Sequence, residues 1–223
     1  MGKMVLKIDL HCHSEYSWDS KVPIKLYIKK AEIMGLGAIS ITDHNDTQSH
    51  EKIKKLQSET NVILVPGQEI NTLEGHLLIY GWLPTIDRDL SMDDTVTLAR
   101  KIGGDQIIYC IAAHPFDKFR GGKGKIIFNT GIDGLEILNA SALLGRFNSS
   151  AKKNSEKLQL IKTGNSDSHR ISEFGVAWTE IPDVTTVEEV LINLKVGIAK
   201  GERIGIKRKS TRFIRRKFGK MTD

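Results

Sequence analysis

Short apolar runs alternate with amphipathic stretches along most of the chain. Residues 5–10 form an apolar run of strand-forming residues, and residues 23–34 repeat apolar side chains at helical spacing until Gly35 stops the helix. The same pattern predicts further strands over residues 38–42, 62–65, 76–82, 107–113, 134–138, 160–163 and 178–181. It predicts further helices over residues 47–58, 92–102 and 186–200, and a polar helical stretch between 138 and 160.

Two turns refine this pattern. Pro66-Gly67 is expected to end the third strand, and the Glu74-Gly75 turn to make the fourth strand antiparallel to residues 69–73. Strands that alternate with helices are typical of an α/β protein with mostly parallel strands. About seven such strands fit a TIM-like barrel better than a small open sheet.

The composition is that of an ordinary globular domain. Of the 223 residues, 39% are hydrophobic and 27% are charged. The longest apolar run, residues 107–113, is far shorter than the roughly 20 residues that cross a bilayer. The first residues lack the apolar stretch of a signal peptide, and two cysteines give no disulfide framework. We therefore expect a cytoplasmic protein without a membrane interaction.

The net positive charge of the chain comes from its end. The formal net charge is +6, and residues 200–223 contain ten lysines and arginines but only two acidic residues. We expect one domain over residues 1–205 and a basic C-terminal tail over residues 206–223. The tail is either a solvated segment packed on the domain or an arm that makes weak contact with nucleic acid.

Six of the seven histidines lie beside the end or the start of a predicted strand, with carboxylates close to them in sequence. The loops beyond the carboxyl ends of parallel strands gather into one site, so these side chains should converge. The H-x-H and D-x-H spacings point alternate side chains the same way. The candidate metal ligands are His11, His13, Asp19, His44, Glu69, His76, His114, Asp167 and His169.

The donor types of this set point to divalent metals. Crowded carboxylates repel one another unless cations neutralise them, and imidazole and carboxylate are ordinary ligands of zinc, iron and manganese. Any one of these histidines alone would be an ordinary core or surface residue, but the whole set favours a metal centre. Nine ligands suit two or three ions, with Glu69 as the bridging carboxylate.

The order of these motifs resembles the PHP (polymerase and histidinol phosphatase) superfamily of metal-dependent phosphoesterases. The resemblance spans residues 5 to about 205 and rests on D-L-H-C-H-S, Asp19, T-D-H-N, P-G-Q-E, G-H-L-L-I-Y-G, A-A-H-P, L-E-I-L-N and G-N-S-D-S-H. It implies a distorted (β/α)7 barrel with a trinuclear metal site at the carboxyl ends of the strands.

The resemblance also implies which residues hold each ion. One ion takes His11, His13, Glu69 and Asp167, a second takes Asp19, His44 and His169, and a third takes Glu69, His76 and His114. The residues implied to be catalytic are His11, His13, Asp19, His44, Glu69, Asp167 and His169.

The implied reaction is hydrolysis of a phosphate ester by hydroxide shared between metal ions. The resemblance is nearest to stand-alone phosphatases that act on nucleotides or other small phosphorylated metabolites with two or three Mn, Fe or Zn ions. A 5′–3′ exonuclease or short-oligonucleotide phosphodiesterase is the alternative, followed by a histidinol-phosphate phosphatase and a non-catalytic PHP module. Only residues 83–106 stand where many of these relatives carry a capping helical insertion, so a more open cleft is expected.

Several basic residues are candidates for holding the substrate phosphate. Arg170 directly follows D-S-H, and Arg146 follows L-E-I-L-N. The planar guanidinium of arginine suits a phosphate group. Each is otherwise a surface side chain, as are the further candidates in the loop after His114: Lys118, Arg120 and Lys123.

Four other residues lie beside the candidate ligands. Trp18 precedes Asp19 and is expected either to stack on a base or to be buried. Asp43 is a candidate partner of a metal ligand. Asn139 either orients a ligand or caps the next helix. Cys12 should point away from its two histidine neighbours, because side chains alternate along a strand.

Overall fold

Nine strands form a single mixed sheet in the part of the chain that the computed structural model describes, residues 5–204. The basic tail 206–223 and the domain boundary expected at residue 205 lie outside these residues. The sheet has the order β7-β6-β5-β4-β3-β2-β1-β8-β9. The strands are β1 (Val5–Cys12), β2 (Leu36–Ile41), β3 (Ile63–Thr72), β4 (Gly75–Tyr80), β5 (Tyr109–Ala112), β6 (Gly134–Asn139), β7 (Ile161–Asn165), β8 (Ala177–Pro182) and β9 (Ile198–Gly201).

The strands are only partly parallel. Pairs β1/β2, β2/β3, β5/β6 and β6/β7 are parallel, whereas β3/β4, β4/β5, β1/β8 and β8/β9 are antiparallel. The predicted antiparallel hairpin across Glu74-Gly75 is confirmed as β3/β4. The expectation of a mostly parallel sheet is wrong, because this hairpin and the two C-terminal strands add antiparallel pairs.

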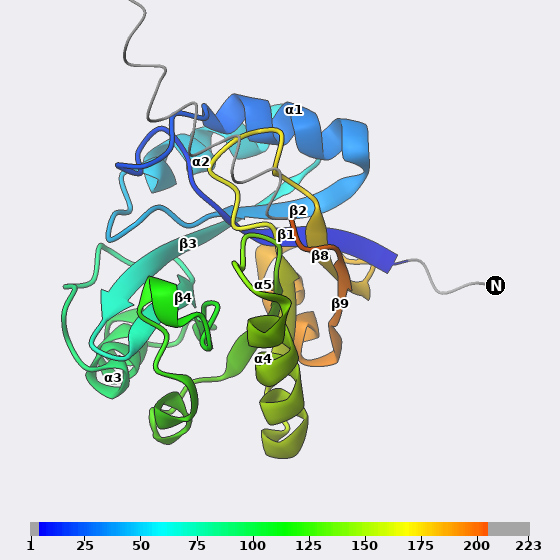
Figure 1. Cartoon of the computed structure of the whole chain (residues 1–223). Coiled ribbons are helices and arrows are strands. Elements are labelled where there is room, and N and C mark those ends of the chain that lie inside the picture. The colour runs from blue at the N-terminus through cyan, green and yellow to red at the C-terminus, as the bar shows by residue number, and fades with distance from the viewer. Residues whose placement is uncertain (1–4, 205–223) are drawn as a thin grey trace, which may run out of the picture.

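The two edges of the sheet approach each other, so that it forms a nearly closed barrel (Figure 1). At the seam, Thr179 of β8 donates from Oγ1 to the carbonyl of Gly164 in β7 at 3.1 Å and accepts from its N–H at 2.9 Å. Just beyond β7, the carbonyl of Ser168 accepts from the N–H of His13 at 2.9 Å. These contacts hold the segment after β7 beside the end of β1. The predicted barrel class is thus confirmed.

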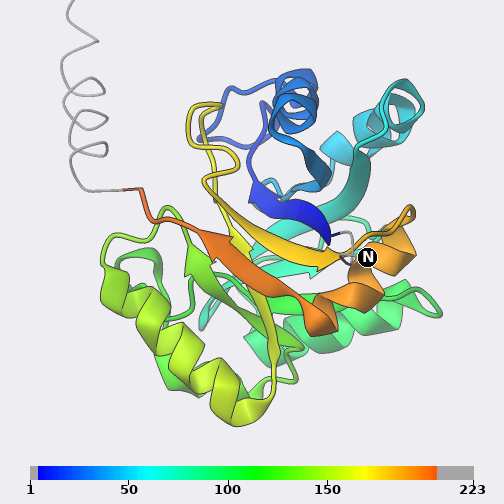
Figure 2. The same cartoon turned by 90° about the vertical axis from the view of Figure 1, so that its right-hand side faces the viewer.

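Within residues 5–204, five α-helices surround the barrel. They are α1 (Ile24–Met34), α2 (Ser49–Leu56), α3 (Met92–Gly103), α4 (Gly145–Leu158) and α5 (Val187–Asn193). Figures 1 and 2 both show α1 and α2 on one side of the sheet and α3 and α4 on the opposite side. Each side has its own apolar core. Tyr27 of α1 is buried in one, and Met92 and Val96 of α3 are buried in the other. A third cluster joins strand residues such as Ile8 and Leu78 to α5.

The predicted helix over residues 186–200 is wrong in its second half. Helix α5 ends at Asn193, a short 3₁₀ turn follows, and β9 begins at Ile198. Gly197 lies so close to β8 that an added Cβ would meet Thr179 Cγ2 at 2.8 Å. Ile198 is exposed, and its backbone pairs with Glu180. The apolar spacing that predicted a helix here therefore comes from a helix and an edge strand in succession.

Pro66-Gly67 does not end the third strand, which continues to Thr72. Pro66 pairs with Ile41 of β2, and its carbonyl accepts from the N–H of Gly81 at 3.0 Å. Gly67 then pairs with Tyr80 of β4. Because the partner strand changes at this point, the missing N–H of Pro66 does not interrupt β3.

A register shift lies at the end of β1, just before the histidine motif. The pairing with β2 is irregular between Asp9 and Cys12. An extra residue in one strand breaks the strict alternation of side chains. Ile8 and Leu10 pack in one apolar cluster, but Cys12, which would continue their alternation, packs in another. His11 and His13 face the barrel end instead, as the contacts below show.

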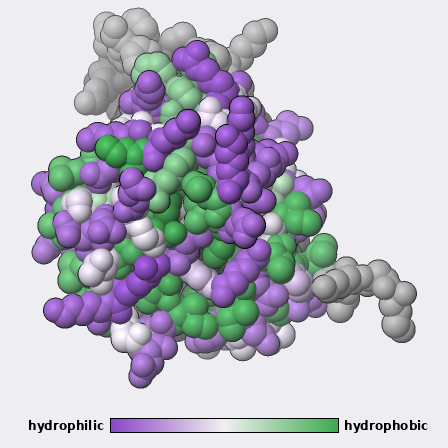
Figure 3. Space-filling model, turned by 90° about the horizontal axis from the view of Figure 1, so that it is seen from below, coloured by the Kyte–Doolittle hydropathy of each residue, from purple (hydrophilic) through white to green (hydrophobic). Residues whose placement is uncertain are grey.

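The face seen in Figure 3 is mixed, with hydrophilic side chains between smaller groups of hydrophobic ones. Within residues 5–204, every helix is too short or too polar to span a bilayer.

The barrel seam gives a stability prediction. An added Cβ at Gly164 would meet the Trp178 carbonyl oxygen at 2.8 Å, whereas at Gly145 the nearest atom, of Arg203, is 3.8 Å away. Gly164→Ala should lower the free energy of unfolding by about 1–3 kcal/mol, because backbone cannot move aside cheaply. Gly145→Ala is the control and should change it by less than about 0.5 kcal/mol. Urea denaturation measures both, and equal stability of the two variants would contradict a close-packed seam.

Candidate metal centre

The nine predicted metal ligands meet at one end of the barrel. Each has a nitrogen or oxygen atom within 3.5 Å of an imidazole or carboxylate atom of another member. They come from β1 and the loop after it (His11, His13, Asp19), the loop after β2 (His44), β3 (Glu69), the start of β4 (His76), and the loops after β5 (His114) and β7 (Asp167, His169).

Glu69 lies at the middle of this set and is 1% exposed. Its Oε2 atom is 3.2 Å from Nε2 of His11, 3.1 Å from Nε2 of His13 and 3.3 Å from Nδ1 of His44. Three imidazoles from two separate segments thus share one carboxylate oxygen.

The other oxygen of Glu69 faces a different pair of histidines. Its Oε1 atom is 2.9 Å from Nδ1 of His76 and 3.2 Å from Nε2 of His114. A carboxylate whose two oxygens face separate groups of imidazoles has the geometry of a bridging ligand.

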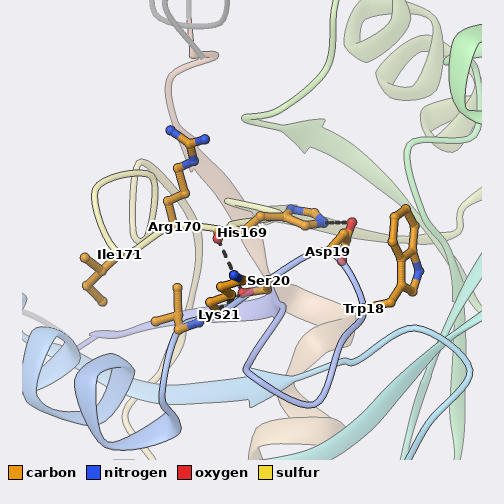
Figure 4. Close-up of a pocket in the computed structure, with 8 residues that line it drawn as sticks. Trp18, Asp19, Ser20, Lys21, His169, Arg170 and Ile171 are labelled. Carbon is orange, nitrogen blue, oxygen red and sulfur yellow. Dashed lines mark hydrogen bonds and ion pairs between the residues drawn. The ribbon is translucent and has the colours of Figure 1, made fainter. Parts of the chain in front are cut away.

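A second group gathers around Asp19. Its Oδ2 atom is 2.8 Å from Nε2 of His169 (Figure 4). The same oxygen is 3.7 Å from Nε2 of His44. One ligand atom from each of Asp19, His169, His44 and His13 lies within 4.8 Å of the others. This arrangement could hold one ion with imidazole and carboxylate donors.

Asp167 joins the two groups. Its Oδ1 atom is 3.5 Å from Nε2 of both His11 and His13, and 3.6 Å from Nδ1 of His169. Its backbone has a φ of +52°, and His114 has a φ of +31°. Residues other than glycine rarely adopt this left-handed backbone region, and such strain is typical of functional sites.

Electrostatics at the centre favour ionised carboxylates. Burial alone would raise the pKa of Glu69, but the neighbouring imidazoles, His11 first, hold that pKa well below its usual value. Burial likewise opposes ionisation of Asp167, but His11 and Arg120 hold its pKa well below normal. Burial would lower the pKa of His13, yet contacts with Asp167 and Glu69 raise it to about 9. Without metal, protons on His11 and His13 therefore offset part of the buried negative charge, whereas burial lowers the pKa values of His44 and His114 to about 4.

The side chains present fit divalent metal ions. Nε2 of His13 and Nδ1 of His44 are buried and face Glu69, but neither has a hydrogen-bond partner among residues 5–204. Burying a polar atom without a partner is costly. A metal ion would satisfy these nitrogens, and imidazole with carboxylate is a donor set that zinc, iron and manganese accept.

Glu136 is a functional residue that the sequence analysis missed. This fully buried β6 carboxylate places Oε1 3.0 Å from Nδ1 of His11, and its Oε2 accepts from the N–H of His114 at 2.9 Å. Asn165 donates to Oε1 at 3.0 Å and Asn139 to Oε2 at 2.7 Å. A carboxylate on the second nitrogen of a metal-binding histidine fixes its tautomer and orientation. The available signal was a lone Glu inside an apolar strand run.

Two further carboxylates brace the loops that carry the ligands. Asp9 accepts from the N–H groups of Ser166 and Gly175, and burial raises its pKa to about 6. Asp43 accepts from the N–H of Ser14 at 2.6 Å and from its hydroxyl at 2.8 Å. Asp43 thus acts on the loop after His13 through Ser14.

The cationic candidates lie in different places. Arg120 pairs with Asp167 and Asp117 and donates to Asn139, so it joins the centre directly. Arg170 lines a cavity beside Asp19.

The other three cations lie apart from these contacts. Arg146 is exposed over the Phe147 ring and lines a separate cavity together with Lys118. Lys123 is exposed, and its backbone N–H donates to the carbonyl of Glu74.

Cys12 is fully buried, with its sulfur 4.0 Å from Oγ of Ser166.

Comparison with known proteins agrees with this geometry. The family model of the PHP domain matches residues 9–158. The chain belongs to the PHP domain family. A second model, described as PHP-associated, matches residues 145–197. An uncharacterised protein of Methanocaldococcus jannaschii is 33% identical over 145 residues, which are 60% of this chain and 82% of the relative.

Solved structures share the fold of this PHP protein at low sequence identity. PsfC from Pseudomonas syringae has a TM-score of 0.71 at 16% identity, over 88% of this chain and 91% of its own. A protein of Bifidobacterium adolescentis, proposed to be a metal-dependent phosphoesterase, has a TM-score of 0.65 at 17% identity, over 86% and 96%. An amidohydrolase from Chromobacterium violaceum with bound sulfate has a TM-score of 0.59 at 14% identity, over 73% and 87%.

Glu136 provides a test of the centre in which all nine ligands stay unchanged. Glu136→Gln should weaken divalent metal binding by about 10- to 100-fold, because His11 loses its charged partner. Glu188→Gln, on the exposed face of α5, is the matched control and should bind metal as the unaltered protein does. Isothermal titration calorimetry with Zn²⁺ or Mn²⁺ measures the metal affinity of both variants. Unchanged affinity in Glu136→Gln would show that His11 needs no such partner.

Proposed function

We propose that the chain is a metal-dependent phosphoesterase that hydrolyses phosphate monoesters of small phosphorylated metabolites or nucleotides. The observation that carries this proposal is the Glu69 carboxylate, whose two oxygens face five imidazoles in two groups. Membership of the PHP domain family, and a structural neighbour proposed to be a metal-dependent phosphoesterase, support it. Two or three divalent ions, Mn, Fe or Zn, would bind the nine ligands named above.

Bound ions would act as Lewis acids and lower the pKa of a water molecule into the neutral range. The residues of the chain hold this site in place, and its two cysteines are unsuited to act as nucleophiles. Burial raises the pKa of the Cys110 thiol to about 12 and that of Cys12 well above its usual value. Neither thiol is then a usable nucleophile, since the thiolate is the reactive form. Direct attack by water is the simplest reaction for this set of residues.

The cationic side chains would attract the substrate phosphate. Arg170 lies in a cavity beside Asp19 and His169, and a guanidinium can donate two parallel hydrogen bonds to phosphate oxygens. Arg120 is already paired with Asp167 and is better placed to hold that carboxylate.

A cytoplasmic location is part of the proposal, because both cysteines are free thiols.

Hydrolysis should depend on both metal and ligands. The purified protein with Mn²⁺ should release phosphate from 4-nitrophenyl phosphate and from nucleotides, and chelation should abolish this. His44→Ala should lower kcat/KM by about 100-fold or more, because it removes a metal-binding imidazole that faces both Glu69 and Asp19. The control is His50→Gln, since His50 lies in α2 and contacts the Gly67 carbonyl. Chelator-resistant release, or full activity of His44→Ala, would refute the proposal.

A nuclease is the second candidate, favoured by the basic composition of residues 200–223. End-labelled single-stranded oligonucleotides separate the two activities. Loss of a terminal phosphate without shortening supports the phosphatase, whereas release of mononucleotides supports the nuclease. Deleting residues 207–223 should weaken oligonucleotide binding more at low salt than at high salt if the tail is an accessory arm. Equal binding before and after the deletion would leave the tail without this role.

A further inference from the structure

A cavity of about 460 Å³ lies beside the Asp19 group of the metal centre. Its lining includes the two ligands Asp19 and His169 and four side chains that are not ligands: Trp18, Lys21, Arg170 and Ile171. Figure 4 shows Trp18 on one side of the ligand pair and Arg170, Lys21 and Ile171 on the other. The volume is within the range of about 300–1,000 Å³ that small-molecule sites occupy.

Trp18 is 78% exposed, more than any other large hydrophobic side chain among residues 5–204. Its indole lies over the imidazole of His44, with ring centroids 6.0 Å apart and an angle of 29° between the planes. A single exposed apolar residue needs no explanation by itself. Trp18, however, directly precedes Asp19, stacks on His44 and lines the same cavity as His169.

The backbone that carries Trp18 is held firmly. Ser17 donates from its N–H to the Ser14 carbonyl at 3.0 Å, and Ser20 donates from its N–H to the Ser17 carbonyl at 3.2 Å. The Ser17 hydroxyl donates to Asp19 at 3.0 Å, and the Ser20 hydroxyl donates to the His13 carbonyl at 2.6 Å. The indole is therefore exposed on a fixed turn, which lowers the entropy cost of stacking a ligand on it.

The charges of the cavity suit an anion beside that plane. Lys21 and Arg170 are both exposed side chains in its lining. Asp19, the acidic residue of the lining, is engaged by His169. The cavity thus combines a flat aromatic surface, two cations and access to ligand side chains of the centre.

We propose that Trp18 is a stacking platform that selects phosphate esters of nucleosides, with the base lying on the open face of the indole. The inference rests on the proposed phosphoesterase function and narrows its substrate class. Sugar phosphates and aliphatic phosphate esters offer no planar group for this surface, whereas every nucleobase does. Base–aromatic stacking tolerates all bases, so the platform selects nucleotides as a class.

Adenosine 5′-monophosphate and ribose 5-phosphate form a matched pair, because they share the phosphate and the ribose and differ in the base. Trp18→Ala should lower kcat/KM for adenosine 5′-monophosphate by about 5- to 100-fold. The same variant should change kcat/KM for ribose 5-phosphate by less than about twofold. Trp18→Phe keeps a smaller aromatic face and should lie between. The control Trp82→Ala removes another partly exposed tryptophan, which packs on His50, and should affect neither substrate.

A binding measurement tests the platform without turnover. Adenosine should quench the tryptophan fluorescence of the Zn²⁺-loaded protein and of Trp82→Ala, but not that of Trp18→Phe. If no phosphate ester is hydrolysed by any preparation, the proposed function fails while Trp18-dependent quenching still supports the platform.

Two results would overturn the inference. An equal loss of kcat/KM for both substrates in Trp18→Ala would mean that the indole acts on His44 and the metal centre instead of on a base. Unchanged kinetics for both substrates together with Trp18-independent quenching would mean that the indole contacts no substrate.

Discussion

The structure depends on one constraint, the burial of ionised carboxylates at the end of a barrel. Glu69 and Asp167 are almost fully buried, and the imidazoles around them hold their pKa values well below normal. Buried charge is tolerated only where opposite charge or a metal is near. Five imidazoles on one carboxylate leave nitrogens without hydrogen-bond partners, so protons alone neutralise this site poorly. Divalent ions would neutralise the buried charge and would also provide partners for these nitrogens.

The surrounding chain is organised to hold these groups apart and in place. Glu136 is bonded to His11, His114, Asn139 and Asn165, so one buried carboxylate links the ends of β1, β5, β6 and β7. Asn165 also accepts from the N–H of Leu10 across the barrel seam at 3.0 Å. The seam and the centre therefore support each other, and a change that opens the barrel also displaces ligands.

Much of the centre was predictable from the sequence, because strand ends of a barrel meet wherever their histidines and carboxylates lie in the chain. The nine candidates do converge, and the Glu74-Gly75 hairpin was recognisable from its turn. Glu136 was missed because a lone carboxylate in an apolar strand carries no spacing signal. The end of α5 was missed because helix and edge-strand residues happened to continue one apolar period. The place of Arg120 depended on the path of an irregular loop, which local pattern does not encode.

The division between strands and loops also explains why family membership leaves the substrate open. Most of the metal ligands come from strands or the residues directly after them, and their partners are buried, so few substitutions there preserve the centre. Trp18, Lys21 and Arg170 come from two loops and are exposed. Substitutions at such positions change what the cavity accepts at little cost in stability. Structures that share this fold at 14–17% identity show how widely the sequence can vary on one barrel, and a shared fold does not fix the function. The proposed substrate specificity of this chain rests on these exposed loop side chains.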